Sequence, residues 1–95
     1  MTRRDGERLV LEGPVTIQTV PALLGEARAA CRDGARRVDF AAVEDVDSAA
    51  LALAVALLRE AAADGRGLEF ANLPAAMVKL AELYSVSGLI DSTGS

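Results

Sequence analysis

The side chains with the most chemical capacity stand together in the stretch Val43–Leu51. The carboxylates of Glu44, Asp45 and Asp47 lie within four positions, and the hydroxyl of Ser48 follows directly. Clustered carboxylates suit hard cations, and paired carboxylates serve as acid and base in hydrolysis. The chain contains no His, and this cluster has no further ligand beside it. We therefore interpret it as a solvated loop, and predict no metal site, no cofactor and no catalytic residue.

Asp47 and Ser48 stand where a helix is predicted to begin. Apolar periodicity indicates a helix over 48–63 that ends at Asp64 and Gly65. The unpaired backbone N–H groups and the dipole at a helix start favour a carboxylate or hydroxyl acceptor. N-capping by Asp47 alone explains its position. Docking of a partner at Ser48 is compatible with that cap.

The predicted helix 48–63 is apolar on more than one side. The face expected to be buried consists of Ala50, Leu53, Ala54, Leu57 and Ala61. The other side carries Ser48, Ala52, Val55, Ala56, Arg59 and Glu60. A solvated face is normally more polar over its first two turns, so a partner's helix is expected to dock there. The alternative is that Ala serves only as a good helix former in an alanine-rich chain.

Strands and helices alternate along the rest of the chain. Strands are expected at 8–12, 15–17, 36–40 and 67–72, and further helices at 19–33 and 74–84. Because Gly13 and Pro14 separate the first two strands, these are expected to form an edge ribbon. The strand 36–40 is expected to be central, and 41–47 to be a loop. Alternation of this kind implies crossover connections and a mainly parallel sheet in an α/β fold.

Two helix ends and the chain termini complete the predicted organisation. Thr19 is the expected N-cap of the first helix and Gly34 its C-terminal stop. A final turn containing Val86, Leu89 and Ile90 is expected to lie under the sheet. The sequence therefore predicts one domain over 1–95, with a core at about 8–90 and flexible ends at 1–7 and 91–95.

Composition excludes several classes of function. The formal net charge is −4 and the sequence pI is about 4.7, which argues against nucleic acid and against anionic lipid surfaces. No apolar segment follows the polar N-terminus, and the run 49–58 is too short to span a membrane. The single Cys31 cannot form an internal disulfide and is expected to be a buried, inert thiol.

Three segments together form a recognisable pattern. They are Val46-Asp47-Ser48-Ala49-Ala50-Leu51, Gly65-Arg66-Gly67-Leu68-Glu69-Phe70-Ala71-Asn72 and Leu80-Ala81-Glu82-Leu83-Tyr84-Ser85-Val86. Over about 8–90 the chain resembles the STAS domain, the fold of bacterial anti-sigma-factor antagonists and of regulatory domains on anion transporters. The first segment is similar to that family's Asp-Ser/Thr-x-Gly-Leu pattern. The resemblance implies a STAS fold with a sheet of about four strands and a regulatory, non-enzymatic role.

Two departures from the antagonist pattern indicate a branch of the family. The antagonists typically carry Asp-Ser-Ser-Gly-Leu, and the second serine is phosphorylated by the partner kinase. Here Ala49 occupies that place, and Ala50 replaces the glycine. A single hydroxyl directly after the aspartate, at Ser48, is more similar to the STAS subunit of the Mla-type phospholipid transporter. The stretch Leu80–Tyr84 is also similar to that subunit.

The resemblance implies a cytoplasmic subunit, held at the inner membrane through its complex, that binds the ATPase of an ABC transporter for phospholipids and supports lipid asymmetry. The partner-binding residues it implies are Asp47, Ser48, Ala49, Ala52, Val55 and Arg59. The alternative is an anti-sigma-factor antagonist, in which Ser48 would be the phosphorylation site. A small-ligand sensor is a third option, for which the sequence shows no pocket. The oligomeric state stays open, with a homodimer among the options.

Overall fold

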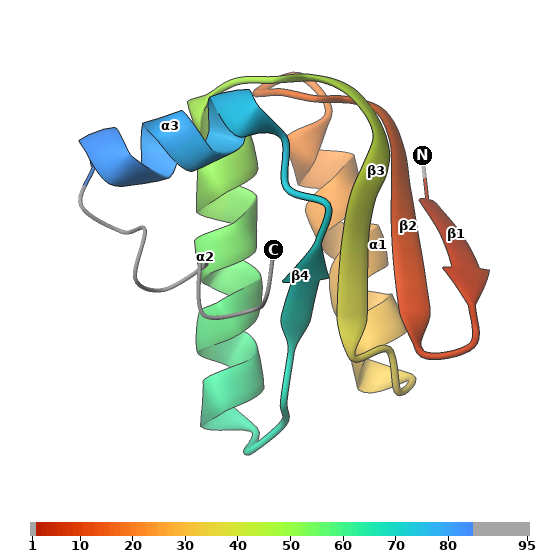
Figure 1. The fold of residues 1–95 in the computed structure, drawn as a ribbon. Coiled ribbons are helices and arrows are strands. Elements are labelled where there is room, and N and C mark those ends of the chain that lie inside the picture. Colours follow the sequence, from red (N-terminus) through yellow and green to blue (C-terminus); the bar gives the residue numbers. More distant parts are fainter. Residues whose placement is uncertain (1, 85–95) are drawn as a thin grey trace.

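A mixed four-stranded sheet forms the centre of the computed structural model, which describes residues 2–84 (Figure 1). The strands are β1 (Thr2–Asp5), β2 (Arg8–Val15), β3 (Arg37–Val46) and β4 (Glu69–Ala71), in the spatial order β1-β2-β3-β4. The helices are α1 (Val20–Arg32), α2 (Ser48–Ala63) and α3 (Ala75–Leu83). β2, β3 and β4 are parallel, and β1 is antiparallel to β2. This arrangement confirms the predicted α/β class and mainly parallel sheet.

The core lies between the sheet and helices α1 and α2. Figure 1 shows α1 and α2 running side by side along one face of the sheet, while α3 crosses the upper end of α2. Apolar side chains of all three parallel strands point to those helices, and Phe40 and Phe70 meet edge to face with their ring centres 6.0 Å apart. The sheet contributes Leu9, Leu11, Val38, Phe40 and Phe70 to this core.

Both long helices bury one apolar face in the core. The predicted apolar face of α2 is buried along its whole length: Ala50, Leu53, Ala54, Leu57 and Ala61. On α1, the buried residues are Leu23, Ala27, Ala30 and Cys31, with Val20 and Leu24 half-buried beside them. Gly34 follows the C-cap of α1 with φ 107°, in the left-handed region that only glycine adopts readily. In residues 2–84, no helix is both long enough and apolar enough to cross a membrane.

The N-terminal strands differ from the prediction. β1 lies within the segment 1–7 that was expected to be flexible, and it forms the edge of the sheet. β2 runs through Gly13 and Pro14 without interruption and pairs on both sides, so the predicted edge ribbon of 8–12 and 15–17 is wrong. Pro14 is tolerated because it falls at a register irregularity, where no ladder hydrogen bond requires its missing N–H.

β3 is much longer than predicted. Its length was missed because two register irregularities interrupt the strand pattern in the sequence. It continues to Val46, so most of the expected loop 41–47 is strand. The pairing shifts between Val10–Asp39 and Glu12–Ala42, and again between Gly13–Val43 and Val15–Val46, and at each place β3 has one residue more than β2. Such a bulge leaves a backbone N–H unpaired and bends the strand.

Asp39 supplies the acceptor that the first of these bulges requires. Its carboxylate is almost fully buried and accepts from the Ala41 N–H at 2.8 Å. The same carboxylate accepts from Arg8 Nη1 at 3.2 Å and from Asn72 Nδ2 at 3.0 Å. One aspartate of β3 therefore binds β2 and the residue that follows β4, and it fixes the course of β3 towards α2. The predicted final turn at 86–90 and the tail 91–95 lie outside the described residues.

Candidate partner-binding site

Asp47 caps α2, as the sequence predicts. Its backbone is extended, with φ −133° and ψ −169°, and its Oδ1 accepts from the Ala49 N–H at 2.8 Å. An aspartate at this position satisfies one of the N–H groups that a helix start leaves unpaired. Its negative charge is also favourable at the positive end of the helix dipole.

The second oxygen of Asp47 holds the turn between β2 and α1. Asp47 Oδ2 accepts from the Ile17 N–H at 3.0 Å, and the Asp47 N–H donates to the Val15 carbonyl at 3.4 Å. The β2–α1 turn and the start of α2 therefore lie side by side at the upper end of the sheet (Figure 1). Both carboxylate oxygens of Asp47 bind the chain's own backbone, so Asp47 holds the β2–α1 turn against the start of α2. We call this junction the corner. Direct contact of Asp47 with a partner stays a prediction.

Ser48 begins an exposed stripe along α2. Ser48, Ala52 and Arg59 are exposed and Val55 is half-buried. Their spacing of four, three and four residues places them on one side of a helix, opposite the buried face. We define Ser48, Ala52, Val55 and Arg59 as the α2 stripe. Ala49 is half-buried beside it and donates its N–H to Asp47, so it lies at the edge of the stripe.

The stripe is open to a partner. Within residues 2–84 the Ser48 hydroxyl has no hydrogen-bond partner and the Arg59 guanidinium has no ion pair. The first two turns present small or aliphatic side chains rather than charges. The α2 stripe therefore has small or aliphatic side chains between one polar group at each end, and docking of a partner on it stays a prediction.

Glu44 and Asp45 lie beside the corner and are exposed. With Val43, Val46, Pro74 and Ala76 they line a small cavity of about 110 Å³ between β3 and the start of α3. Within residues 2–84, no three His, Cys, Asp or Glu side chains are placed to hold a metal ion. The two carboxylates give the corner a negative rim.

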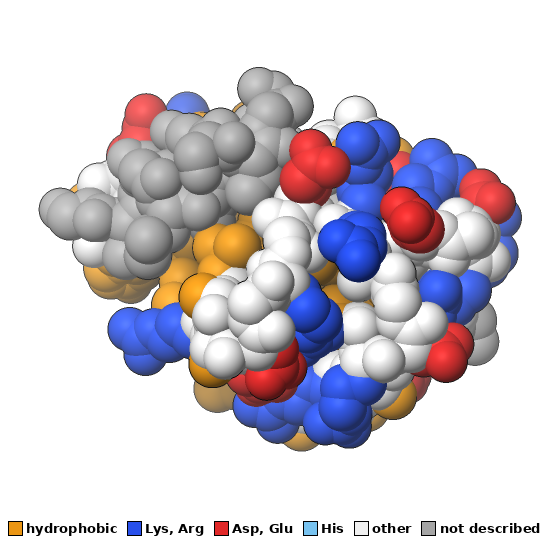
Figure 2. All heavy atoms as spheres, turned by 90° about the horizontal axis from the view of Figure 1, so that it is seen from below, with side chains coloured by type: hydrophobic (Ala, Val, Ile, Leu, Met, Phe, Trp, Pro, Cys, Tyr) orange, Lys and Arg blue, Asp and Glu red, His pale blue; other side chains and the backbone are white. Residues whose placement is uncertain are grey.

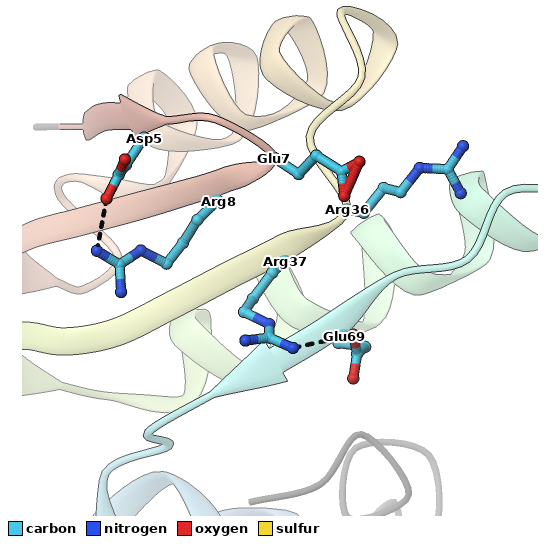
Figure 3. A pocket seen from close by; sticks show the side chains of 6 residues that line it. All are labelled: Asp5, Glu7, Arg8, Arg36, Arg37 and Glu69. Carbon is cyan, nitrogen blue, oxygen red and sulfur yellow. Dashed lines mark hydrogen bonds and ion pairs between the residues drawn. The ribbon is translucent and has the colours of Figure 1, made fainter.

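A larger hollow lies at the opposite end of the sheet, and Figure 3 shows its lining. It measures about 390 Å³ and is bordered only by charged side chains: Asp5, Glu7, Arg8, Arg36, Arg37 and Glu69. Arg8 pairs with Asp5 at 2.9 Å, and Arg37 pairs with Glu69 at 3.3 Å. Figure 2 shows basic and acidic side chains interspersed over this end of the molecule. Because its charges largely pair with each other, the hollow resembles a solvated ion-pair surface.

The thiol of Cys31 lies in the core of the domain. Cys31 is buried, and burial raises the pKa of its thiol even though the neighbouring Arg66 lowers it. A thiol that resists ionisation is a poor nucleophile.

Thr19 occupies the predicted N-cap position, but its hydroxyl makes no cap bond. Instead it accepts from the Thr16 N–H at 2.9 Å and donates to the Pro14 carbonyl at 3.0 Å, and so builds the β2–α1 turn.

Ile17 is the surface residue that sequence reasoning missed. It is 73% exposed and lies in the β2–α1 turn, hydrogen-bonded to the cap of α2. The sequence places it in a short apolar run with Val15, which indicated a strand. Only the turn chemistry of Thr16 and Thr19 could have indicated that Ile17 projects outwards.

Comparisons with known proteins agree with this geometry. The unphosphorylated anti-sigma factor antagonist SpoIIAA has a similar fold, with TM-score 0.64, 20% identity, and coverage of 87% of this chain and 81% of that chain. A putative anti-sigma factor antagonist from Thermotoga maritima aligns with TM-score 0.73 and 13% identity, over 95% and 81% of the two chains. At these identities the likeness concerns the fold alone. A search of curated proteins gives no match.

A family model gives the more specific result. The model described as "Mlab, STAS domain" matches residues 1–91, which is nearly the whole chain. STAS domains act through protein–protein interactions and are typically non-enzymatic. The fold, the capped α2 and the family model agree, and this chain belongs to the MlaB-type STAS domain family.

Proposed function

We propose that this chain is an accessory subunit that binds the ATPase of a Mla-type phospholipid ABC transporter and stabilises or activates it. The chain would act in the cytoplasm, held at the inner membrane through the complex. It would perform no catalysis itself. The observation that carries this proposal is the α2 stripe, an exposed helix side with small apolar side chains in its first two turns and a Ser48 hydroxyl that has no hydrogen-bond partner among residues 2–84.

The stripe has the properties of a helix-packing surface. Small side chains at Ala52 and Val55 allow a partner's backbone to approach α2 closely, and their burial contributes apolar contact. The free hydroxyl of Ser48 can donate to a carbonyl or carboxylate at the end of that contact. Arg59, three turns further along, can form an ion pair with an acidic side chain of the partner. Support for the ATPase as partner comes from the family membership.

The substitution Ser48→Arg tests the interface. Ser48 is exposed, so a long side chain there fits the fold, but it would occupy the space of a docked helix. We expect binding to the cognate ATPase to weaken at least about a hundredfold, which is roughly 2.7 kcal/mol. Isothermal titration calorimetry with purified subunits measures this. Normal binding by Ser48→Arg would show that the α2 stripe is not the interface.

Ala63→Arg is the matched control. Ala63 is exposed at the other end of the same helix, about 22 Å from Ser48 along its axis. The same charge and bulk placed there should leave both affinity and melting temperature near those of the unmodified chain. Co-purification from the native cells, followed by mass spectrometry, then identifies the partner without assumption.

A second candidate is an anti-sigma-factor antagonist. Two solved structures with similar folds bear that description. Ser48 also presents, at a helix start where a phosphate group is stabilised, a hydroxyl that no group of residues 2–84 binds. Against it, Ala49 removes the hydroxyl that the antagonists use. Recovery of a kinase-like anti-sigma factor from cells, and a mass increase of one phosphoryl group at Ser48, would favour this candidate over the transporter.

A further inference from the structure

Ile17 is an exposed apolar side chain held in a rigid turn. Its exposed fraction is 73%, and only Leu83 and Tyr84 are comparable among the large hydrophobic residues of 2–84. Single exposed hydrophobic residues are common and usually need no explanation. Ile17 differs from such residues in how firmly its backbone is fixed and in what it is fixed to.

The turn around Ile17 is closed by hydrogen bonds on both sides. The N–H groups of Thr19 and Val20 donate to the Thr16 carbonyl at 3.0 and 2.8 Å. The Thr19 hydroxyl binds the backbone at Thr16 and Pro14. The Ile17 N–H itself is bound to Asp47. Little backbone conformational entropy therefore remains to be lost when the Ile17 side chain contacts another molecule.

The link to Asp47 makes Ile17 part of the same corner as the α2 stripe. Asp47 binds the Ile17 N–H with one oxygen and caps α2 with the other, so Ile17 keeps a fixed position relative to Ser48. On the far side of the corner, the exposed carboxylates of Glu44 and Asp45 add negative charge. An apolar projection on one side of the corner and negative charge on the other specify a complementary surface, which combines an apolar pocket with basic side chains placed apart from it.

We infer that Ile17 is a specificity-determining contact that inserts into an apolar pocket on the ATPase that docks on the α2 stripe, with Lys or Arg of that ATPase facing Glu44 and Asp45 on the other side of the corner. The inference rests on the proposed function and deepens it. Ser48 and the small side chains of α2 permit close approach, and Ile17 selects among partners by the shape of its branched side chain. Removing a methylene from such a contact weakens binding a few-fold, and removing the whole side chain weakens it far more.

Three variants and one control test the inference by calorimetry with the cognate ATPase. Ile17→Ser removes the apolar side chain but keeps the backbone N–H, and it should weaken binding about tenfold to a hundredfold. Ile17→Val should weaken binding only about fourfold, because one methylene is lost. Leu83→Ser removes a side chain that is equally exposed, at 74%, from the end of α3, and it should leave affinity unchanged. Ser48→Arg reports on the interface as a whole.

The outcomes separate the two proposals. Ile17 is supported as the contact if Ile17→Ser loses the most affinity, Ile17→Val loses less, and Leu83→Ser binds like the unmodified chain. If Ser48→Arg abolishes binding while Ile17→Ser matches Leu83→Ser, the role of Ile17 is refuted and the transporter interface stands. If the unmodified chain does not bind the ATPase, the proposed function fails and the inference fails with it. Melting temperatures within about 2 °C of each other show that the variants are folded.

Discussion

Replacing Asp47 with Ala tests whether one carboxylate holds the corner together. The change removes the acceptor for the Ala49 N–H at 2.8 Å and the acceptor for the Ile17 N–H at 3.0 Å. Loss of an N-cap costs about 1 kcal/mol. A hydrogen bond to a charged acceptor contributes about 1.5 kcal/mol or more, which we reduce to about 1 kcal/mol because the Ile17 bond is exposed. We therefore expect the free energy of unfolding to fall by roughly 2 kcal/mol.

Urea unfolding followed by circular dichroism measures this loss, and a thermal melt should show a decrease of about 10 °C. Asp45→Ala is the matched control, because Asp45 is exposed and has no hydrogen bond or ion pair within residues 2–84. It removes the same charge two residues away and should cost less than about 0.5 kcal/mol. Asp47→Asn keeps one acceptor oxygen and should lie between the two. Equal urea midpoints for Asp47→Ala and Asp45→Ala would refute the assignment of both hydrogen bonds.

Two further predictions concern buried groups. Because burial raises the pKa of the Cys31 thiol, Ellman's reagent at pH 8 should label the native chain far more slowly than the chain in urea, and equal rates would show that the thiol is accessible. Asp39→Ala leaves the Ala41 N–H, Arg8 and Asn72 without their acceptor. It should lower the free energy of unfolding by roughly 3 kcal/mol. Glu7→Ala is the control: it removes an exposed carboxylate and should change the urea midpoint little.

Helix periodicity predicted the elements that carry the site. The bounds of α2, its buried face and its Asp47 cap follow from the spacing of apolar residues and from the chemistry of helix ends. The α2 stripe follows too, because exposure on a helix depends on the same period. These features are local, so a single sequence contains the information that determines them.

β3 was only half predicted because its pattern is not that of a regular strand. Its inward residues are Val38, Phe40, Val43 and Val46, separated by two, three and three positions. A strand alternates with a period of two, so the segment after Phe40 has the sequence pattern of a loop. The cause is the pair of register shifts against β2, which depends on contacts with residues about thirty positions away.

The edge strand and Ile17 escaped prediction for a different reason. β1 is polar and exposed, since an edge strand gains its stability from backbone pairing with β2 rather than from burial. The exposure of Ile17 results from the turn that Thr16, Thr19 and Asp47 build around it. Neither feature leaves an apolar period in the sequence.

With its two bulges, the number of residues in β3 determines where α2 begins. Each extra residue advances the phase of the strand by one position, so that Asp47 arrives in register with the Ile17 N–H. Loss of one residue between Phe40 and Val46 would give a more regular strand and a misplaced corner. We therefore expect a one-residue insertion or deletion in β3 to displace the contact between Asp47 and Ile17 more than most point substitutions on the surface would. A length change in the turns at the opposite end of the sheet would leave this phase untouched.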